Sequence, residues 1–171
     1  MKILLSGSSG FVGSNLLNFV KQFKWVVQSL SRHELNFSHN VISDKADVII
    51  HLAGKAHDFK KDVDEIEYYE TNTNLTSNLF DSFLNSNANV FITLSSVKAV
   101  ADQVKGELTE EHSPDPITHY GKSKLLAEQY ILSKPIPSGK RVYILRPCMI
   151  HGNGNKGNLN LLYKLIVSRI P

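Results

Sequence analysis

Cysteine is nearly absent from this sequence, and its scarcity excludes several classes of protein. Cys148 is the single cysteine in 171 residues, so no disulfide can form within the chain and no zinc site can be built from several cysteines. Seven histidines are present, but they show neither an HExxH motif nor the paired spacing of metal ligands. We therefore expect no metal site, and the composition fits a reducing compartment.

Long hydrophobic runs are also missing. Apolar stretches such as DVIIHLAG are far shorter than the roughly 18 residues that cross a bilayer, and the N-terminal MKILLSGSSG becomes rich in glycine too early for a secretory signal. Charge is not concentrated either, because the net charge is +3 and the lysines are scattered. We expect a cytoplasmic protein that binds neither membranes nor nucleic acid, with a mildly basic balance that suits an anionic small molecule.

Short apolar runs rich in β-branched residues recur along the chain, at 2–6, 25–30, 47–53, 89–95 and 141–147. Helical patterns occur at 11–23, about 64–86, about 120–133 and about 158–169, whereas 31–46 is too short and polar for a helix. Runs that are apolar without alternation indicate strands buried on both faces. The pattern predicts an α/β fold with a Rossmann-like, doubly wound parallel sheet, and a surface loop over 106–121 at the edge where such sheets bind ligands.

A glycine-rich stretch, LLSGSSGFVGSNL, joins the first strand to the first helix. Gly7 suits a tight turn, Gly10 lets the backbone approach a pyrophosphate, and Gly13 allows close packing of helix on strand. A plain turn with helix-capping glycines would look similar. The position after the first strand of a parallel α/β chain favours dinucleotide binding.

Five further motifs follow in order: HLAG (51–54), TNTNLT (71–76), LSSV (94–97), HYGKSK (119–124) and RPCMIHGNG (146–154). Together with the Gly-x2-Gly-x2-Gly spacing they resemble the extended short-chain dehydrogenase/reductase family of NAD(P)-dependent nucleotide-sugar epimerases, dehydratases and reductases. The resemblance covers the whole chain. Gly54, Leu75 and His151 replace the family's usual Ala, Gly and Tyr, which bears on cofactor packing and substrate fit.

The resemblance implies a catalytic set of Ser96, Tyr120 and Lys124. On a helix, residues four apart share a face, so the Lys124 ammonium can act on the Tyr120 phenol, whose reference pKa is about 10. Tyr120 would exchange a proton with a sugar hydroxyl while Ser96 hydrogen-bonds the same oxygen. A second copy of the spacing, Tyr130 and Lys134, begins roughly 15 Å further along the same helix at about 1.5 Å per residue, so we interpret Tyr130 as a packing residue and Lys134 as a helix-end cation. His119, beside Tyr120, could touch the substrate, but we interpret it as a loop residue.

The cofactor contacts that the resemblance implies are, in chain order, Gly7, Gly10, Phe11, Val12, Gly13, Leu52, Ala53, Gly54, Asn72, Tyr120 and Lys124. At the end of the second strand, enzymes specific for NAD carry an acidic residue that binds the adenosine ribose. This position holds Ser31, followed by Arg32, which could pair with a 2′-phosphate, and Asn36 is a candidate adenine contact. The cofactor is therefore NAD or NADP, with a slight preference for NADP.

The substrate class also follows from the resemblance. Val97 and Lys98 occupy the positions where sugar 4,6-dehydratases need an acidic pair, so we expect a nucleotide-sugar 4-epimerase or 4-keto reductase, in surface polysaccharide biosynthesis. The alternative is a catalytically silent dinucleotide-binding sensor or scaffold, against which the retained Ser96, Tyr120 and Lys124 argue.

The expected organisation is one NAD(P)-binding Rossmann domain over residues 1–171. Family members are usually much longer, so we expect their C-terminal, substrate-binding lobe to be missing from this chain. The resemblance further implies a homodimer formed through the helices at about 64–86 and 120–133.

Overall fold

The computed structural model describes residues 1–31, 34–35, 46–56, 65–104, 106–152, 154–155, 163 and 165–168. A single sheet has the order β2-β1-β3-β4-β5, and all neighbouring strands are parallel. Its strands are β1 (Lys2–Ser6), β2 (Val26–Leu30), β3 (Val48–His51), β4 (Val90–Leu94) and β5 (Arg141–Leu145). The predicted fold class is confirmed, because all five strands occur inside the predicted apolar runs.

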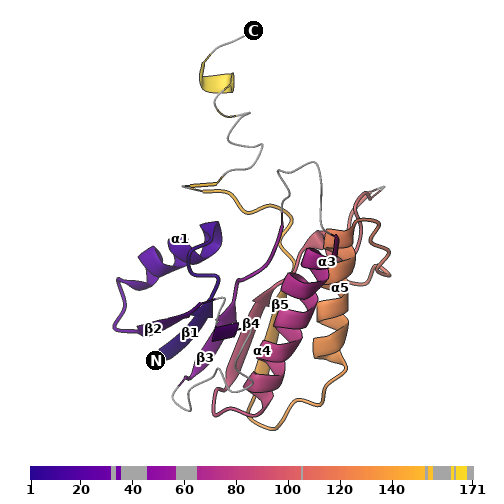
Figure 1. Cartoon of the computed structure of the whole chain (residues 1–171). Coiled ribbons are helices and arrows are strands. Elements are labelled where there is room, and N and C mark those ends of the chain that lie inside the picture. Colours follow the sequence, from indigo (N-terminus) through magenta and orange to yellow (C-terminus); the bar gives the residue numbers. More distant parts are fainter. Residues whose placement is uncertain are drawn as a thin grey trace.

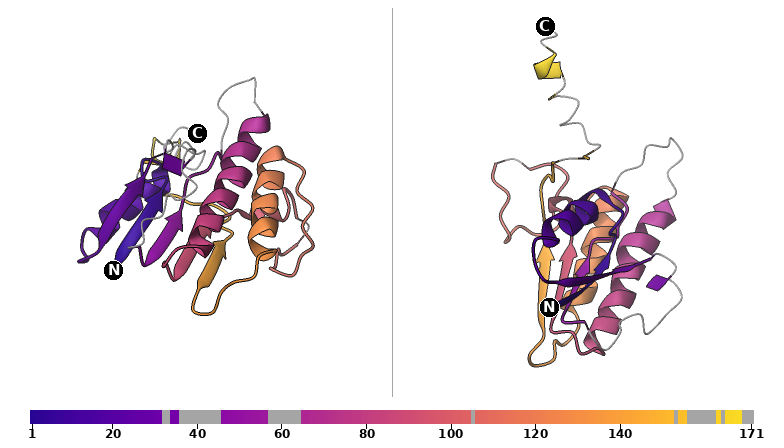
Figure 2. Two further views of the ribbon diagram at one scale, coloured as in Figure 1. Left: turned by 60° about the horizontal axis from the view of Figure 1, so that its bottom comes forward. Right: turned by 90° about the vertical axis from the view of Figure 1, so that its left-hand side faces the viewer.

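The helices cover both faces of the sheet (Figures 1 and 2). Helix α1 (Phe11–Val20) lies on one face, whereas α4 (Leu75–Leu84) and α5 (His119–Leu132) lie side by side on the other. Right-handed crossovers explain this division, because the chain moves from β1 to β2 in one direction and from β3 to β5 in the opposite direction. The strand order therefore reverses between β1 and β3.

The main hydrophobic core lies between the sheet and α4. Phe80 and Phe83 of α4 pack on Phe91 of β4 with ring centroids 5.2 and 5.3 Å apart, and all three side chains are fully buried. Ile49 of β3 and Ile131 of α5 extend this cluster on either side. The core thus fixes α4 and α5 against the strands whose ends carry the predicted site.

The helix predicted over about 64–86 is confirmed, but it is not regular. It comprises α3 (Glu65–Tyr68), a π-helical turn η1 (Tyr69–Asn74) and α4. A π-helical turn inside an α-helix is often found at a functional site. The predicted helix at 158–169 falls mostly outside the described residues. The loop predicted over 106–121 is confirmed as far as residue 118, but α5 begins at His119, which is therefore a helix residue and not a loop residue. A short 3₁₀ helix, η2 (Val97–Ala99), precedes this loop.

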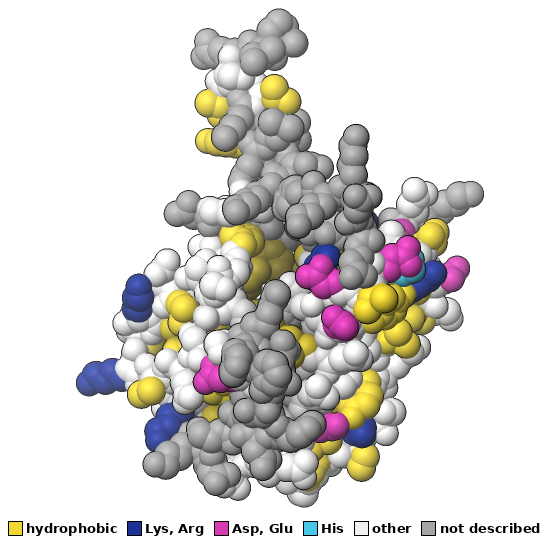
Figure 3. Space-filling view, in the orientation of Figure 1, with side chains coloured by type: hydrophobic (Ala, Val, Ile, Leu, Met, Phe, Trp, Pro, Cys, Tyr) yellow, Lys and Arg dark blue, Asp and Glu magenta, His cyan; other side chains and the backbone are white. Residues whose placement is uncertain are grey.

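The described residues contain no helix long and apolar enough to span a membrane and no group of three or more His, Cys, Asp or Glu side chains that could hold a metal ion. On the face shown in Figure 3, acidic and basic side chains are interspersed. This distribution agrees with the scattered lysines of the sequence.

Candidate active site

The predicted site residues gather around the carboxyl ends of β1, β3 and β4. Register aligns these ends, since Ser6 pairs with His51 and His51 pairs with Thr93. The reversal of strand order lies at the same place. Open parallel sheets bind their ligands at such a point.

The glycine loop after β1 is packed too closely to accept side chains. Gly7 has a φ of 73°, and a Cβ there would lie 2.5 Å from the backbone nitrogen of Ala53. A Cβ on Gly13 would overlap the carbonyl oxygen of Gly7. Glycine is therefore required at both positions, for conformation at the first and for space at both.

Helix α1 begins at this loop with an N-terminus that has no side-chain cap. Gly10 is the N-cap residue, and the first turn, which contains the partly buried Phe11 and Val12, carries no acidic residue. Free backbone N–H groups and the positive end of the helix dipole attract anions. The loop and helix start thus fit the pyrophosphate of a dinucleotide.

The HLAG turn after β3 lies directly against the glycine loop. Leu52 donates its backbone N–H to the Ser6 carbonyl at 3.1 Å, which continues the sheet by one bond. A Cβ on Gly54 would lie 3.1 Å from Lys124 Nζ and 3.0 Å from Asn72 Oδ1. The glycine that departs from the family's usual alanine therefore gives room to two other predicted site residues.

His51 connects β1 and β3 to the helix behind them through a buried hydrogen-bond chain. Thr76 Oγ1 donates to the Asn72 carbonyl at 2.7 Å, so it must accept from His51 Nε2 at 2.9 Å. His51 Nδ1 is then unprotonated and accepts from Ser6 Oγ at 2.6 Å. Burial first, and the charge of Lys124 second, lower the pKa of His51 to about 3, which keeps the ring neutral.

Asn72, which the sequence predicts as a cofactor contact, has an amide that is hydrogen-bonded within the protein. Its side chain is fully buried, and Oδ1 accepts from the Lys55 N–H at 2.8 Å. Nδ2 donates to the Lys55 carbonyl at 2.9 Å and to Ser123 Oγ at 3.0 Å. The amide is thus used within the protein, where it holds the chain after the HLAG turn against α5.

Ser96, Tyr120 and Lys124 meet at the end of β4. Ser96 is the N-cap of η2 and accepts from the Lys98 N–H at 3.2 Å. Burial raises the pKa of Tyr120, and a hydrogen bond with the Ser96 side chain opposes that rise. Lys124 Nζ donates to the carbonyl of Leu94 at 2.9 Å. Leu94 is the last residue of β4 and lies two residues before Ser96.

The electrostatics of this set are dominated by burial. Lys124 is only 9% exposed, and burial lowers its pKa to about 8, while the negative charge of Glu128 acts in the opposite direction. At neutral pH Lys124 therefore remains mostly cationic, and Tyr120 is a neutral phenol. At neutral pH the phenol therefore carries a proton that it can donate, with a buried cation four residues further along the same helix.

The second Tyr-Lys copy serves to join α5 to α4. Tyr130 Oη donates to Asp81 Oδ2 at 2.6 Å, and Lys134 Nζ lies 3.7 Å from Asp81 Oδ1. Tyr130 also packs against the core cluster, as the sequence predicts.

The end of β2 differs from the sequence interpretation. Ser31 donates its backbone N–H and its hydroxyl to Glu34 Oε2 at 2.7 and 2.6 Å, and the Glu34 N–H returns to Ser31 Oγ at 3.2 Å. This reciprocal arrangement is a capping box. It places a carboxylate where the sequence predicts space for a phosphate, while Arg32 and Asn36 lie outside the described residues.

The match to known families agrees with this geometry. The family model for the "NAD dependent epimerase/dehydratase family" matches residues 3–170. The chain belongs to this epimerase/dehydratase family.

Three known proteins illustrate what the chain is similar to. A UDP-glucose 4-epimerase from Vibrio cholerae is 32% identical over 99% of this chain and 58% of its own length. The structure of a UDP-glucuronic acid 4-epimerase from Bacillus cereus with NAD has a TM-score of 0.83 at 22% identity, covering 100% of this chain and 64% of that one. RMD from Pseudomonas aeruginosa, complexed with NADPH, has a TM-score of 0.72 at 28% identity, covering 86% and 53%. The chain thus spans 53% to 64% of the length of these three proteins. Two of the structures contain a nicotinamide dinucleotide.

Several residues beside the epimerase/dehydratase motifs were missed from sequence. Tyr68 is buried with its ring centroid 6.2 Å from that of Tyr120, and Lys55 Nζ lies 5.0 Å from the centre of the Tyr68 ring. Lys55 also forms an ion pair with Glu67. The position of Lys55 directly after the HLAG turn is the one signal in the sequence that could have indicated it.

Proposed function

We propose that this protein is an NAD-dependent 4-epimerase of nucleotide sugars, with Tyr120, Ser96 and Lys124 as its catalytic residues. The main support for this proposal is that these three side chains lie together at the end of β4, at the same edge of the sheet as a glycine loop that fits a pyrophosphate. The named relative with the UDP-glucose 4-epimerase activity supports the reaction class.

The proposed cofactor site uses the glycine loop and the open N-terminus of α1 for the pyrophosphate. Leu52, Ala53 and Gly54 would line the adjoining turn, and Lys124 would reach the nicotinamide ribose. When bound, the nicotinamide supplies the acceptor and donor of hydride. Phe11 and Val12 would shield the phosphates from the side of the helix.

The side chains of the protein would transfer the proton of the reacting sugar hydroxyl and orient its oxygen. Ser96 and Tyr120 together would hydrogen-bond the oxygen on the reacting sugar carbon, which fixes its position. Tyr120 would hold or take the proton of that oxygen, and the buried ammonium of Lys124 would stabilise the phenolate. Tyr120 is only partly buried, so its side chain is accessible to a substrate at the sheet edge.

Glu34 bears on the choice between NAD and NADP. Its carboxylate is bonded to Ser31 at the end of β2, and a negative charge there repels a 2′-phosphate. This contact shifts our proposal from the slight NADP preference of the sequence to NAD. An NAD-dependent epimerase regenerates its cofactor in each cycle and needs no net reductant.

A 4-keto reductase is the second candidate, supported by the NADPH bound to RMD from Pseudomonas aeruginosa. We propose a place in surface polysaccharide biosynthesis for either activity, on the strength of the SSVKA segment. A homodimer through α4 and α5 is also proposed, since Leu126 and Leu132 leave apolar surface exposed on α5; light scattering on the full-length protein would test it.

The deciding experiment incubates the full-length protein with NAD or NADPH and a panel of UDP-hexoses, UDP-glucuronic acid and 4-keto sugars. Sugar identity is followed by NMR and the cofactor by absorbance. Interconversion of C4 epimers without net cofactor turnover supports the epimerase, and stoichiometric oxidation of NADPH supports the reductase.

Tyr120→Phe serves as the catalytic variant and Tyr130→Phe as its matched control on the same helix. We expect the first to abolish hydride transfer with cofactor binding retained, because it removes a hydroxyl and little apolar area. Cofactor binding without turnover by the wild type on the whole panel would favour the silent sensor instead. A damaging Tyr130→Phe beside a harmless Tyr120→Phe would overturn the residue assignment.

A further inference from the structure

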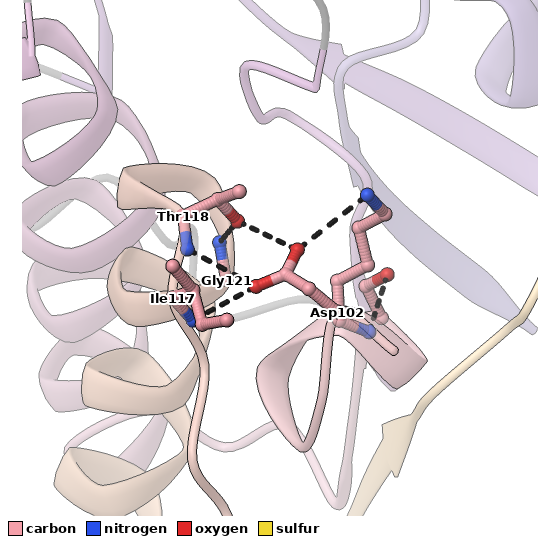
Figure 4. Close-up of polar contacts among 6 residues, drawn as sticks. Asp102, Ile117, Thr118 and Gly121 are labelled. Atoms are coloured by element: carbon pink, nitrogen blue, oxygen red, sulfur yellow. Dashed lines mark hydrogen bonds and ion pairs between the residues drawn. The ribbon is translucent and has the colours of Figure 1, made fainter. Parts of the chain in front are cut away.

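Asp102 forms a compact set of contacts that none of the recognised motifs includes. Its Oδ2 accepts the backbone N–H groups of Ile117 at 2.8 Å and Thr118 at 3.1 Å, and Oδ1 accepts the Thr118 hydroxyl at 3.1 Å (Figure 4). Lys98 Nζ lies 3.5 Å from the same Oδ1. One carboxylate thus closes the whole loop between η2 and α5.

Asp102 is ionised at neutral pH. Burial alone would raise the pKa of its carboxyl, but the hydrogen bonds from Thr118 and Ile117, with the charge of Lys98, hold it below its usual value. Hydrogen bonds to a charged group are roughly twice as strong as neutral ones. The contacts of Asp102 therefore form a firm link at a side chain that is only 11% exposed.

On one side, this link acts on the start of α5. Thr118 is the N-cap of α5, and its hydroxyl accepts from the Gly121 N–H at 3.2 Å while donating to Asp102. Tyr120 lies between these two residues in the first turn. Fixing Thr118 from both sides therefore sets the position and direction of the turn that carries the Tyr120 phenol.

On the other side, the link is attached to Ser96. Ala101 donates its N–H to the Val97 carbonyl at 3.1 Å, and Lys98 donates its N–H to Ser96 Oγ, so Asp102 follows a short rigid turn that starts at the serine. A Cβ on Gly121 would overlap the Lys98 carbonyl oxygen. The backbones of η2 and α5 are thus in direct contact at the point where Asp102 joins them.

We propose that Asp102 is a positioning residue that sets the Tyr120 hydroxyl against Ser96 by joining η2 to the N-terminus of α5. The inference rests on the proposed catalytic function of Tyr120 and Ser96. Under this proposal Asp102 does not touch the substrate. It sets the distance between the Tyr120 and Ser96 hydroxyls by holding Thr118 in place. A misplacement of about 1 Å at such a pair can slow the reaction about 100-fold.

The first test needs no sugar substrate. The full-length protein is labelled with 3-fluorotyrosine, and the Tyr120 fluorine signal is identified by its loss in Tyr120→Phe. We expect Asp102→Ala and Thr118→Val to move and broaden this signal and to shift its pH titration, whereas Asp115→Ala should leave it unchanged. Asp115 is an exposed acid in the same loop, which makes it a matched control.

The second test uses turnover of the UDP-hexose found active under the proposed function. Asp102→Ala should lower kcat about 10- to 100-fold with the Kd for NAD unchanged, and the primary deuterium isotope effect should rise because hydride transfer becomes slower. Thr118→Ser, which keeps the hydroxyl, should restore kcat relative to Thr118→Val. The double variant Asp102→Ala/Thr118→Val should lose less than the sum of the two single losses, since the two variants share the bond between the Thr118 hydroxyl and Asp102 Oδ1.

The outcomes separate the two proposals. If the wild type turns over none of the sugars, the proposed function fails while the fluorine signal still decides the role of Asp102. A wild-type Tyr120 signal in Asp102→Ala, with only a lower melting temperature, overturns the positioning role. If Asp102→Ala does not fold, Asp102→Asn, which keeps one acceptor oxygen, takes its place under the same criteria.

Discussion

The buried imidazole of His51 makes the stability of this protein depend on pH. Burial and the charge of Lys124 lower its pKa from the ordinary 6.5 to about 3. Below pH 6.5 the unfolded chain therefore takes up a proton that the folded chain excludes. The stability contributed by this difference is complete above that pH and is lost as the pH falls towards 3.

The magnitude follows from the two pKa values. Between about pH 7 and pH 5, protonation of the unfolded chain at His51 lowers the free energy of unfolding by about 2 kcal/mol. His51→Gln keeps a donor and an acceptor for Thr76 and Ser6 but cannot titrate. At pH 7 we expect this variant to be about 1–3 kcal/mol less stable than the wild type, through poorer hydrogen bonds. The gap should shrink by about 2 kcal/mol at pH 5.

Urea unfolding followed by circular dichroism at both pH values measures this gap. His112→Gln, at an exposed position, is the control for the same replacement away from the core. Carboxylates titrate equally in all three proteins, so they cancel in the comparison. Identical pH dependence of the wild type and His51→Gln would refute the reasoning, because it would mean that His51 titrates alike in both states.

Three further predictions concern other contacts. Arg146→Met leaves the buried Glu128 carboxylate without its ion-pair partner. We expect this variant to lower the free energy of unfolding by about 3 kcal/mol in urea denaturation. A loss below about 1 kcal/mol would show that the ion pair is solvated. The Lys140 ammonium donates to three carbonyls in and just after the last turn of α4, at 2.7 to 2.9 Å. Lys140→Met should therefore lower the free energy of unfolding by about 1–3 kcal/mol in the same assay; unchanged stability would show that these three bonds do not stabilise the fold. Gly13→Ala should abolish NAD binding in calorimetry, because its Cβ overlaps the Gly7 carbonyl; wild-type affinity in that variant would contradict the pyrophosphate site.

The sequence alone was sufficient for the strands and for the ends at which the site forms. The run KILLS is apolar on both sides because both faces of β1 are buried. In β4 every second residue is buried and the others are partly buried, so its apolar run is equally visible along the chain. Glycine at 7 and 13 is equally visible, since no other residue fits there. The order of motifs also separated Tyr120 from Tyr130, because position along one helix is fixed by its rise per residue.

Tertiary structure decided which partner each polar side chain has. The sequence predicts Asn72 as a cofactor contact, and the structure adds that its amide is bonded to Lys55 and Ser123, which are 17 and 51 residues away. Asp102 carried no signal, because its partners Ile117 and Thr118 are brought to it only when the loop closes. Sequence patterns report burial and backbone conformation residue by residue. Hydrogen bonds between distant segments depend on where folding places both partners, and this is why the chain's motifs could indicate the site while only the folded structure showed what holds it together.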